Sequence, residues 1–141
     1  ADVVVEGIGN HGCEYMTGGH ALVIGSTGQN FGAGMSGGIA YIYDPKHVFK
    51  DKVNLDMVDL YSVSKKIDLN IIKKMLKKHV LYTDSSKGLK ILKSWKNTQK
   101  DFVKVYPKDY HEIQKAIRHL KEKGTNNNLL EKAFELVVNP N

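Results

Sequence analysis

Three side chains near the start of the chain are of the kinds that bind transition metals: His11, Cys13 and His20. Imidazole nitrogen and thiolate sulfur are common zinc ligands. Two of the three residues flank different turns of one coil, and nineteen residues later the matching positions hold Asn30, Gly32 and Ile39, which are neither His nor Cys. We therefore interpret them as structural and predict no metal site. Because Cys13 is the only cysteine, an internal disulfide and a multi-cysteine zinc or iron–sulfur site are excluded within this chain.

A second candidate is a nucleotide site at residues 7–12, which read Gly-Ile-Gly-Asn-His-Gly after the apolar run at residues 3–5. This is the G-x-G-x-x-G pattern of dinucleotide-binding proteins, which needs a helix directly behind it to receive the pyrophosphate. Only five residues separate Gly12 from the next pair of glycines, too few for a crossover helix. We therefore predict no nucleotide site. The sequence also contains no recognisable Ser–His–Asp or paired-carboxylate arrangement.

The strongest pattern is a repeat in the first part of the chain. The tetrad Met-Thr-Gly-Gly at residues 16–19 returns nineteen residues later as Met-Ser-Gly-Gly at residues 35–38. Short runs rich in β-branched or aromatic residues recur with it, at residues 3–5, 21–24 and 39–43. Repeats of this length indicate stacked units that share a core with their neighbours. The Gly-rich stretches between the runs leave no space for a helix.

This pattern predicts a mainly β fold, a right-handed parallel β-helix with coils of about nineteen residues, followed by an α-helical C-terminal tail. The glycine pairs are expected at coil corners, where positive φ or close stacking excludes a Cβ atom. The methionines are expected to stack inward. No residue is predicted to catalyse a reaction or to bind a cofactor or metal. Seven residues are predicted to be structural: Met16, Gly18, Gly19, Gly28, Met35, Gly37 and Gly38.

Charge divides the chain near residue 45. The first 45 residues carry four acidic and no basic side chains, so the remainder carries +10 of a total that is +6. Twenty of the 21 basic residues are lysines with acidic residues between them, whereas nucleic-acid readers usually depend on arginine. We therefore predict no nucleic-acid partner. A mean hydropathy of −0.37, without an apolar run of roughly 18 residues, predicts no membrane partner.

The second part of the chain reads as helical. Asp68 is expected to cap a helix over residues 68–78, and Ser85 and Ser86 a second helix to about residue 98. Residues 102–107 read as extended, a third helix is expected over 109–123, and a short fourth over 129–137. The predicted domains are therefore residues 1–63 for part of the β-helix, 64–123 for the helical extension and 124–141 for a linker with a possible short helix.

At this point two groups of motifs resemble a known family. Residues 12–19 read Gly-Cys-Glu-Tyr-Met-Thr-Gly-Gly, and residues 23–41 read Val-Ile-Gly-x-Thr-Gly-x-Asn-Phe-x-Ala-Gly-Met-Ser-Gly-Gly-x-Ala-Tyr. Further on, residues 102–110 read Phe-x-Lys-Val-x-Pro-x-Asp-Tyr, after a Trp at position 95. Together, over roughly residues 3–111, these motifs are similar to the C-terminal domain of the glutamate synthase large subunit, or of a fused enzyme. No motif is recognised in the residues after Tyr110, which could begin a linker to the flavin-binding part of a fused enzyme.

The resemblance implies a structural domain of an enzyme that converts glutamine, 2-oxoglutarate and a reductant into two glutamates. The family uses an N-terminal Cys nucleophile, FMN and a three-iron, four-sulfur cluster, and none of the motifs for these matches here. The resemblance therefore implies that this segment braces the glutaminase and FMN-binding synthase domains without being catalytic. The alternative is a free-standing β-helical interaction module, or a subunit of another redox enzyme such as formylmethanofuran dehydrogenase.

Partners and location follow from the same features. The start of the chain reads as the middle of a strand, so we expect a segment of a longer polypeptide, in contact with the other domains of its parent. A truncated first coil would expose unpaired backbone groups, so self-association through that coil is expected. A single cysteine predicts an intracellular location, the cytoplasm by default, with an organelle left open. The electron donor of the parent is not readable from these residues.

Overall fold

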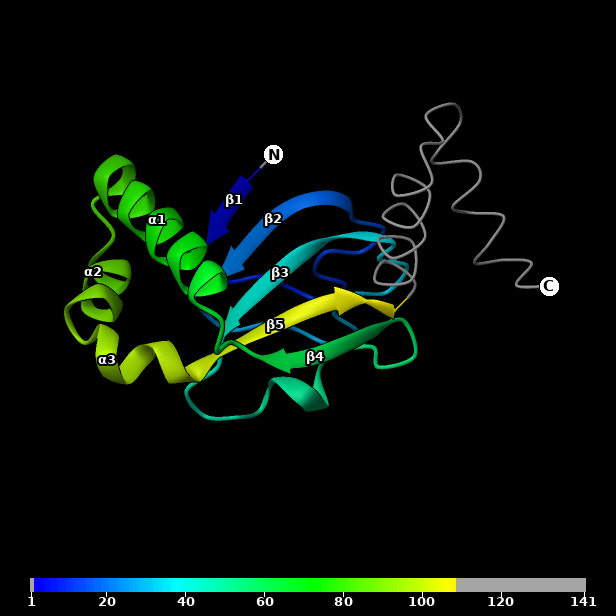
Figure 1. Ribbon diagram of the computed structural model, residues 1–141. Coiled ribbons are helices and arrows are strands. Elements are labelled where there is room, and N and C mark those ends of the chain that lie inside the picture. The colour runs from blue at the N-terminus through cyan, green and yellow to red at the C-terminus, as the bar shows by residue number, and fades with distance from the viewer. Residues whose placement is uncertain (1, 109–141) are drawn as a thin grey trace, which may run out of the picture.

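The computed structural model describes residues 2–108. Five strands in this part of the chain form one mixed sheet in the order β1-β2-β3-β5-β4. Their bounds are Asp2–Val5 for β1, Thr17–Val23 for β2, Gly37–Tyr43 for β3, Val58–Ser62 for β4 and Phe102–Pro107 for β5. In Figure 1 the arrows of β1, β2 and β3 point the same way, whereas β5 runs against both of its neighbours.

Helices follow β4 in the chain and lie beside the sheet (Figure 1). They are α1 (Lys66–Thr83), α2 (Ser86–Lys93) and α3 (Trp95–Thr98). There are also two short 3-10 helices: η1 (Phe49–Asp51) lies before β4, and η2 (Gln99–Asp101) lies just before β5. The two expected helices and the extended segment at residues 102–107 are confirmed, although the first helix is longer and the second breaks at Ser94. The helices expected beyond residue 108 lie outside the described residues, and the proposed domain boundaries stay predictions.

The repeat of nineteen residues is close to the sequence distance between residues that pair in the parallel part of the sheet, which is eighteen between β1 and β2 and mostly nineteen between β2 and β3. Asp2 of β1 pairs with His20 of β2, eighteen residues on, and His20 pairs with Ile39 of β3, nineteen residues on. The turns keep the same spacing, because Ile8 forms a parallel bridge with Thr27. Residues 2–19, the first unit, therefore lie alongside residues 20–38, the second unit.

The predicted right-handed parallel β-helix is wrong. The described chain is a small mixed α/β domain with a five-stranded sheet and three helices. The neighbour of β3 is not a third parallel coil but β5, which pairs antiparallel and comes from more than fifty residues further along the chain. β4 then pairs antiparallel with β5 at the far edge. The repeat correctly indicated the three parallel strands β1, β2 and β3. It gave no information on which strand would pair with the free edge of β3.

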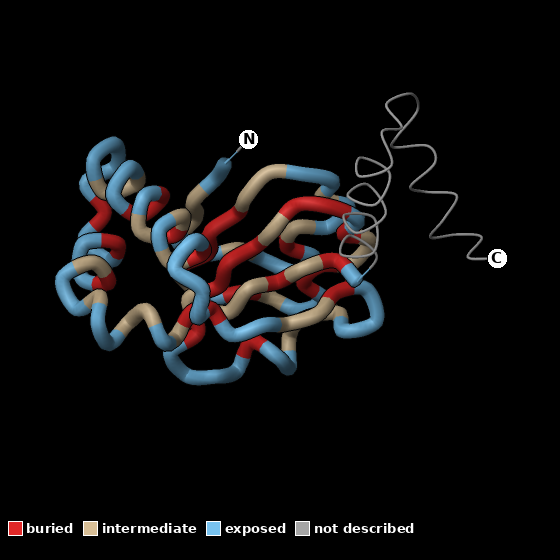
Figure 2. The backbone as a smooth tube through the Cα atoms, viewed as in Figure 1, coloured by how far each residue is buried: buried red, intermediate tan, exposed pale blue. Residues whose placement is uncertain are grey.

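The sheet buries side chains on both faces because successive residues of a strand point to opposite sides. Towards the loops lies one core, which contains Ala21, Val23, Phe31, Met35, Ala40, Ile42, Phe49, Val58 and Val105. Towards the helices lies a second core, which contains Leu22, Ile24, Tyr41, Val63, Ile72, Met75, Leu76, Ile91 and Phe102. Figure 2 shows the buried segments running through the middle of the sheet and along one side of α1. Within residues 2–108, no helix is long and apolar enough to cross a membrane.

Candidate functional site

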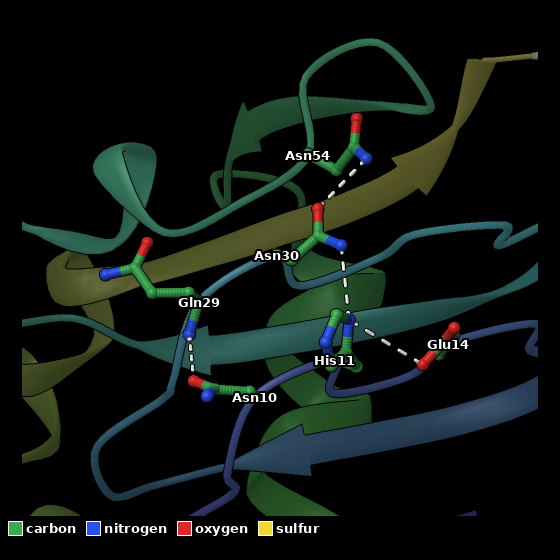
Figure 3. Close-up of polar contacts among 6 residues, drawn as sticks. All are labelled: Asn10, His11, Glu14, Gln29, Asn30 and Asn54. Atoms are coloured by element: carbon green, nitrogen blue, oxygen red, sulfur yellow. Dashed lines mark hydrogen bonds and ion pairs between the residues drawn. The ribbon is translucent and has the colours of Figure 1, made fainter.

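A group of polar side chains lies on the turns between strands, and we call Asn10, His11, Asn30 and Asn54 the polar stack (Figure 3). Three side chains are hydrogen-bonded in series. Asn54 Nδ2 donates to Asn30 Oδ1 over 3.1 Å, and Asn30 Nδ2 lies 3.1 Å from Nδ1 of His11. Beside them, the backbone N–H of Gln29 donates to Asn10 Oδ1 over 2.8 Å. The stack thus joins each turn to the next through amide side chains.

The backbone of the turns explains why these residue types stand there. His11 and Asn30 both have positive φ, 62° and 60°, a conformation that Asn and His tolerate better than most residues. Main-chain hydrogen bonds link the same turns, from His11 N to Gln29 O over 2.8 Å and from Asn54 N to Phe31 O over 2.7 Å. Side chain and backbone therefore hold one register across three turns.

The imidazole of His11 has two competing neighbours. Its Nδ1 accepts a hydrogen from Asn30 only while that nitrogen carries no proton. The same Nδ1 lies 3.8 Å from Glu14 Oε2, a contact that would be an ion pair only in the protonated form. An imidazole without a proton on Nδ1 is therefore the form that belongs to the stack, and Glu14 lies beside it with its side chain 37% exposed. This geometry bonds the turns together and provides no general base held against a reacting group.

Cys13 lies beside the stack but is a poor nucleophile. Burial raises the pKa of its thiol to about 11, so the reactive thiolate is scarce at neutral pH. His20 does not approach it, because the His20 imidazole is bonded to Asp2 Oδ1 over 2.9 Å. Among residues 2–108, no group of three or more His, Cys, Asp or Glu residues could hold a metal ion. The three candidate metal ligands of the sequence are therefore not brought together.

The seven residues predicted to be structural do not form one cluster: the methionines lie in or against the loop-side core, four glycines lie at the starts of β2 and β3, and Gly28 lies in the segment between these strands. Met35 is buried in the loop-side core and Met16 packs against it. The glycine pairs lie at the starts of β2 and β3, not at turns as expected, and only the second glycine of each pair has positive φ, 79° at Gly19 and 81° at Gly38. Of the remaining predicted glycines, Gly28 and Gly37 face the backbone of the first unit, whereas Gly18 faces open space.

A buried polar group that the sequence reading missed lies on the helix side of the sheet. The hydroxyl of Tyr41 donates to Asp68 Oδ1 over 2.8 Å, and Lys104 Nζ lies 3.1 Å from the same oxygen. Burial first, and then the bond to Asp68, raise the pKa of Tyr41. Asp68 does not cap α1 as predicted: the cap position is Lys65, without a side-chain bond. Asp68 lies four residues before the buried Ile72 and seven before the buried Met75. That spacing could have placed Asp68 on the inner face of α1.

The second expected cap is confirmed. Ser85 precedes α2, and its hydroxyl oxygen accepts the backbone N–H of Gly88 over 3.0 Å. Near this cap, His79 Nε2 of α1 lies 3.0 Å from Glu6 Oε2 of the first unit. That contact joins residues 73 positions apart. It fixes the helical layer to the turn after β1, and nothing in the local sequence of either residue indicated it.

Comparison with known proteins gives a consistent result. A model of the family described as GXGXG motif matches residues 1–108. The chain is 48% identical over 124 residues to the NADPH glutamate synthase large chain of Bacillus subtilis and 46% over 113 residues to the NADH glutamate synthase of Schizosaccharomyces pombe. It is 42% identical over 107 residues to the ferredoxin-dependent glutamate synthase of Pyropia yezoensis.

The three alignments cover most of this chain and little of the relatives. They span 87%, 80% and 76% of the chain, but only 8%, 5% and 7% of the respective relatives. Their names differ in the electron donor, so they do not choose among NADPH, NADH and ferredoxin. None of the three is a formylmethanofuran dehydrogenase subunit, so these relatives favour the resemblance to glutamate synthase over that alternative.

Proposed function

The chain belongs to the GXGXG motif family and is homologous to glutamate synthase large chains, and on that premise we propose that it is a non-catalytic domain that braces the catalytic domains of such an enzyme. The parent reaction would convert glutamine, 2-oxoglutarate and a reductant into two glutamates. Its partners would be the glutaminase and synthase domains of the same polypeptide.

The observation that carries the proposal is the use of the polar side chains in the first two units. The amides of Asn10, Asn30 and Asn54 bond one turn to the next, and the His20 and His79 imidazoles bond carboxylates of the first unit. Such contacts fix register, whereas a catalytic site needs groups directed at a substrate. This arrangement supports a bracing role.

The cofactors of the parent do not fit the residues of this chain. A three-iron, four-sulfur cluster held by three cysteines needs three thiolates, and the sequence contains one cysteine. The segment with the G-x-G-x-x-G pattern, residues 7–12, leads through a turn directly into β2. No helix begins behind it that could receive a flavin or nicotinamide phosphate. We therefore propose that FMN and the cluster bind outside this domain.

Substitutions in the full-length parent enzyme test the proposal. We expect Phe31→Ala to lower the melting temperature of the enzyme, since truncating a buried Phe costs about 3–5 kcal/mol. The double change His11→Ala and Glu14→Gln should leave kcat and KM of the folded enzyme within about twofold, because neither side chain would contact a substrate.

The contrary result is specific. A loss of tenfold or more in kcat for His11→Ala with Glu14→Gln, in an enzyme whose melting curve and FMN content match those of the parent, would contradict a bracing role. The 141-residue chain alone should bind no flavin and form no glutamate from glutamine, 2-oxoglutarate and a reductant. One equivalent of FMN bound to it would contradict the proposal equally.

We further propose that the chain self-associates through β1. Within residues 2–108, β1 pairs only with β2, so it is an edge strand, and Val3 is 51% exposed. Edge strands are commonly guarded by charge. The acidic side chains beside this edge, Asp2 and Glu6, are hydrogen-bonded to His20 and His79, so their carboxylates are held in place by these imidazoles.

Sedimentation velocity at rising concentration is the measurement. We expect the 141-residue chain to associate and Val3→Lys to reduce association, because a lysine on an edge disfavours strand pairing. Leu55→Lys is the matched control, since Leu55 is 50% exposed but lies in a loop. A chain that stays monomeric at millimolar concentration, or equal effects of the two lysines, would show that β1 is not the contact.

A further inference from the structure

A cavity of about 430 Å³ lies at the carboxyl ends of β2 and β3 and belongs to none of the groups described above. Four segments line it: the loop after β2, the segment from the end of β3 to η1, Lys52 just after η1, and Lys87 in the first turn of α2. Figure 1 shows these strand ends and the loop that follows β3 on the same side of the sheet. We infer that this cavity binds a small dicarboxylate anion.

The charge of the lining favours an anion. Three lysines, Lys46, Lys52 and Lys87, line the cavity, and Asp44 is the single acidic residue of the lining. The carboxylate of Asp44 is buried and already bonded, since Oδ1 accepts Val48 N–H over 3.0 Å and Oδ2 accepts Phe49 N–H over 3.2 Å. It is therefore not positioned to neutralise all three ammonium groups, and the lining carries a net positive charge.

One of these ammonium groups is held in place. Lys52 is half-buried, and its Nζ donates to the backbone oxygen of Thr27 over 3.0 Å. An ammonium has three N–H donors, so two remain for a ligand. Lys46 and Lys87 are exposed and can move towards a second anionic group. Hydrogen bonds between an ammonium and a carboxylate are about twice as strong as neutral ones.

The apolar side chains that line the cavity favour a ligand with a carbon chain over a small inorganic ion. Ile24, Ile42 and Phe49 line the cavity but are almost completely buried, so the apolar surface open to a ligand comes mainly from Val48, which is 43% exposed, and from the exposed Pro45. Apolar walls with a few placed polar groups are typical of sites for organic molecules, and the volume falls in the usual range of such sites. A chloride or phosphate ion would leave the apolar surface uncovered. A short carbon chain with a carboxylate at each end satisfies both the apolar lining and the separated lysines.

Binding can be measured on the 141-residue chain by titration with glutarate at constant ionic strength, followed by amide NMR shifts. We expect saturable shifts at Ser26, Thr27 and Lys46, with a millimolar dissociation constant. Lys52→Gln keeps hydrogen-bond donors but removes the charge, and it should weaken binding about tenfold. Lys87→Gln should weaken glutarate binding by a smaller factor. Because Lys87 is exposed, this substitution should not disturb folding, so it tests the cavity even if Lys52→Gln fails to fold.

Three controls separate this proposal from general charge attraction. Lys77→Gln removes an exposed lysine outside the cavity and should leave the dissociation constant unchanged. Neutral glutaramide should produce no saturable shift. Inorganic phosphate that binds as tightly as glutarate would overturn the dicarboxylate assignment, and so would the absence of saturation or an equal effect of Lys77→Gln. None of these readouts depends on the catalytic role of the parent enzyme.

Discussion

The first unit (residues 2–19) and the second unit (residues 20–38) share three glycines at a spacing of nineteen residues, and these glycines have different surroundings in the two units. A Cβ atom at Gly9 or Gly18 would meet no atom within 4 Å. Their counterparts nineteen residues later are enclosed: a Cβ at Gly28 would lie 2.5 Å from Asn10 N, and one at Gly37 would collide with the Thr17 carbonyl. The motif is shared, but in the described chain only the second copy has a backbone lying against it.

The two units also differ in charge. The first unit contains three acidic side chains, whereas the second contains no Asp, Glu, Lys or Arg. The acidic residues of the first unit face imidazoles, at Asp2 with His20, Glu6 with His79 and Glu14 with His11. The second unit lies between the first unit and the rest of the sheet, and it contributes four consecutive buried residues to the two cores, from Ala21 to Ile24. Repeated sequence therefore does not imply equal contributions to stability.

The largest effect is expected from a methyl group at the closest approach between the units. A Cβ at Gly25 would overlap the carbonyl of Glu6, whereas one at Gly7 would make an ordinary contact of 3.7 Å with Ser26 O. We expect Gly25→Ala to lower the free energy of unfolding by about 3–5 kcal/mol and Gly7→Ala by less than about 1 kcal/mol. Urea denaturation of both variants measures the difference. Equal losses would contradict the asymmetry between the units.

A smaller effect is expected at the tetrads. Gly37→Val should cost about 1–3 kcal/mol, because its Cβ meets the Thr17 carbonyl and β3 must shift. Gly18→Val is the matched control, with no atom near its Cβ, so its thermal melt should nearly overlay that of the parent chain. If the melt of Gly37→Val overlays the parent instead, the close approach of Thr17 to β3 is wrong.

The polar stack gives a third test, of whether its side chains join the units. Asn30→Ala removes the two hydrogen bonds of the Asn30 side chain, to His11 and Asn54, and places alanine at a φ of 60°. Asn30→Gly removes the same bonds but tolerates that φ. We expect the glycine variant to lose about 1 kcal/mol of unfolding free energy and the alanine variant somewhat more. A glycine variant as stable as the parent would show that the amide bonds contribute nothing.

Part of this fold could be predicted from the sequence. The strands of the two units were evident because runs of β-branched residues recur at a spacing within one residue of the β1–β2 pairing distance and equal to that of most β2–β3 pairs. The helices were evident from spacing and from the cap at Ser85. What could not be predicted was the neighbour of β3, since β5 has the same alternating pattern as any half-buried strand. Sequence periodicity specifies a unit but not where the stack of units ends.

The candidate site was predictable to a smaller extent. The prediction that Cys13, His11 and His20 form no metal site stays a prediction, although no group of three or more possible ligands gathers among the described residues. The bonds of Asp68 to Tyr41 and of His79 to Glu6 depend on contacts between residues 27 and 73 positions apart. Local patterns report which face a residue occupies. They do not report which residue of another element lies opposite.

The smallest expected effect is a loss of stability in acid that comes from two carboxylates of the first unit. The hydrogen bond from His20 holds the pKa of Asp2 below its usual value, and the bond from His79 does the same for Glu6. A carboxyl group whose folded pKa is lowered stabilises the fold above its unfolded pKa, and that contribution is lost as pH falls through the lowered value. The free energy of unfolding should therefore decrease below about pH 4.5.

Because both carboxylates are exposed, the decrease should be small and should shrink further in high salt. In the double variant Asp2→Asn with Glu6→Gln, the part of the acid dependence that comes from the first unit should disappear. Asp56→Asn is a suitable control, since Asp56 is exposed and lies in a loop outside both units. Urea denaturation at pH 7 and pH 3.5 measures the difference. If the control reduces the acid dependence as much as the double variant does, the histidine–carboxylate contacts of the first unit are not its source.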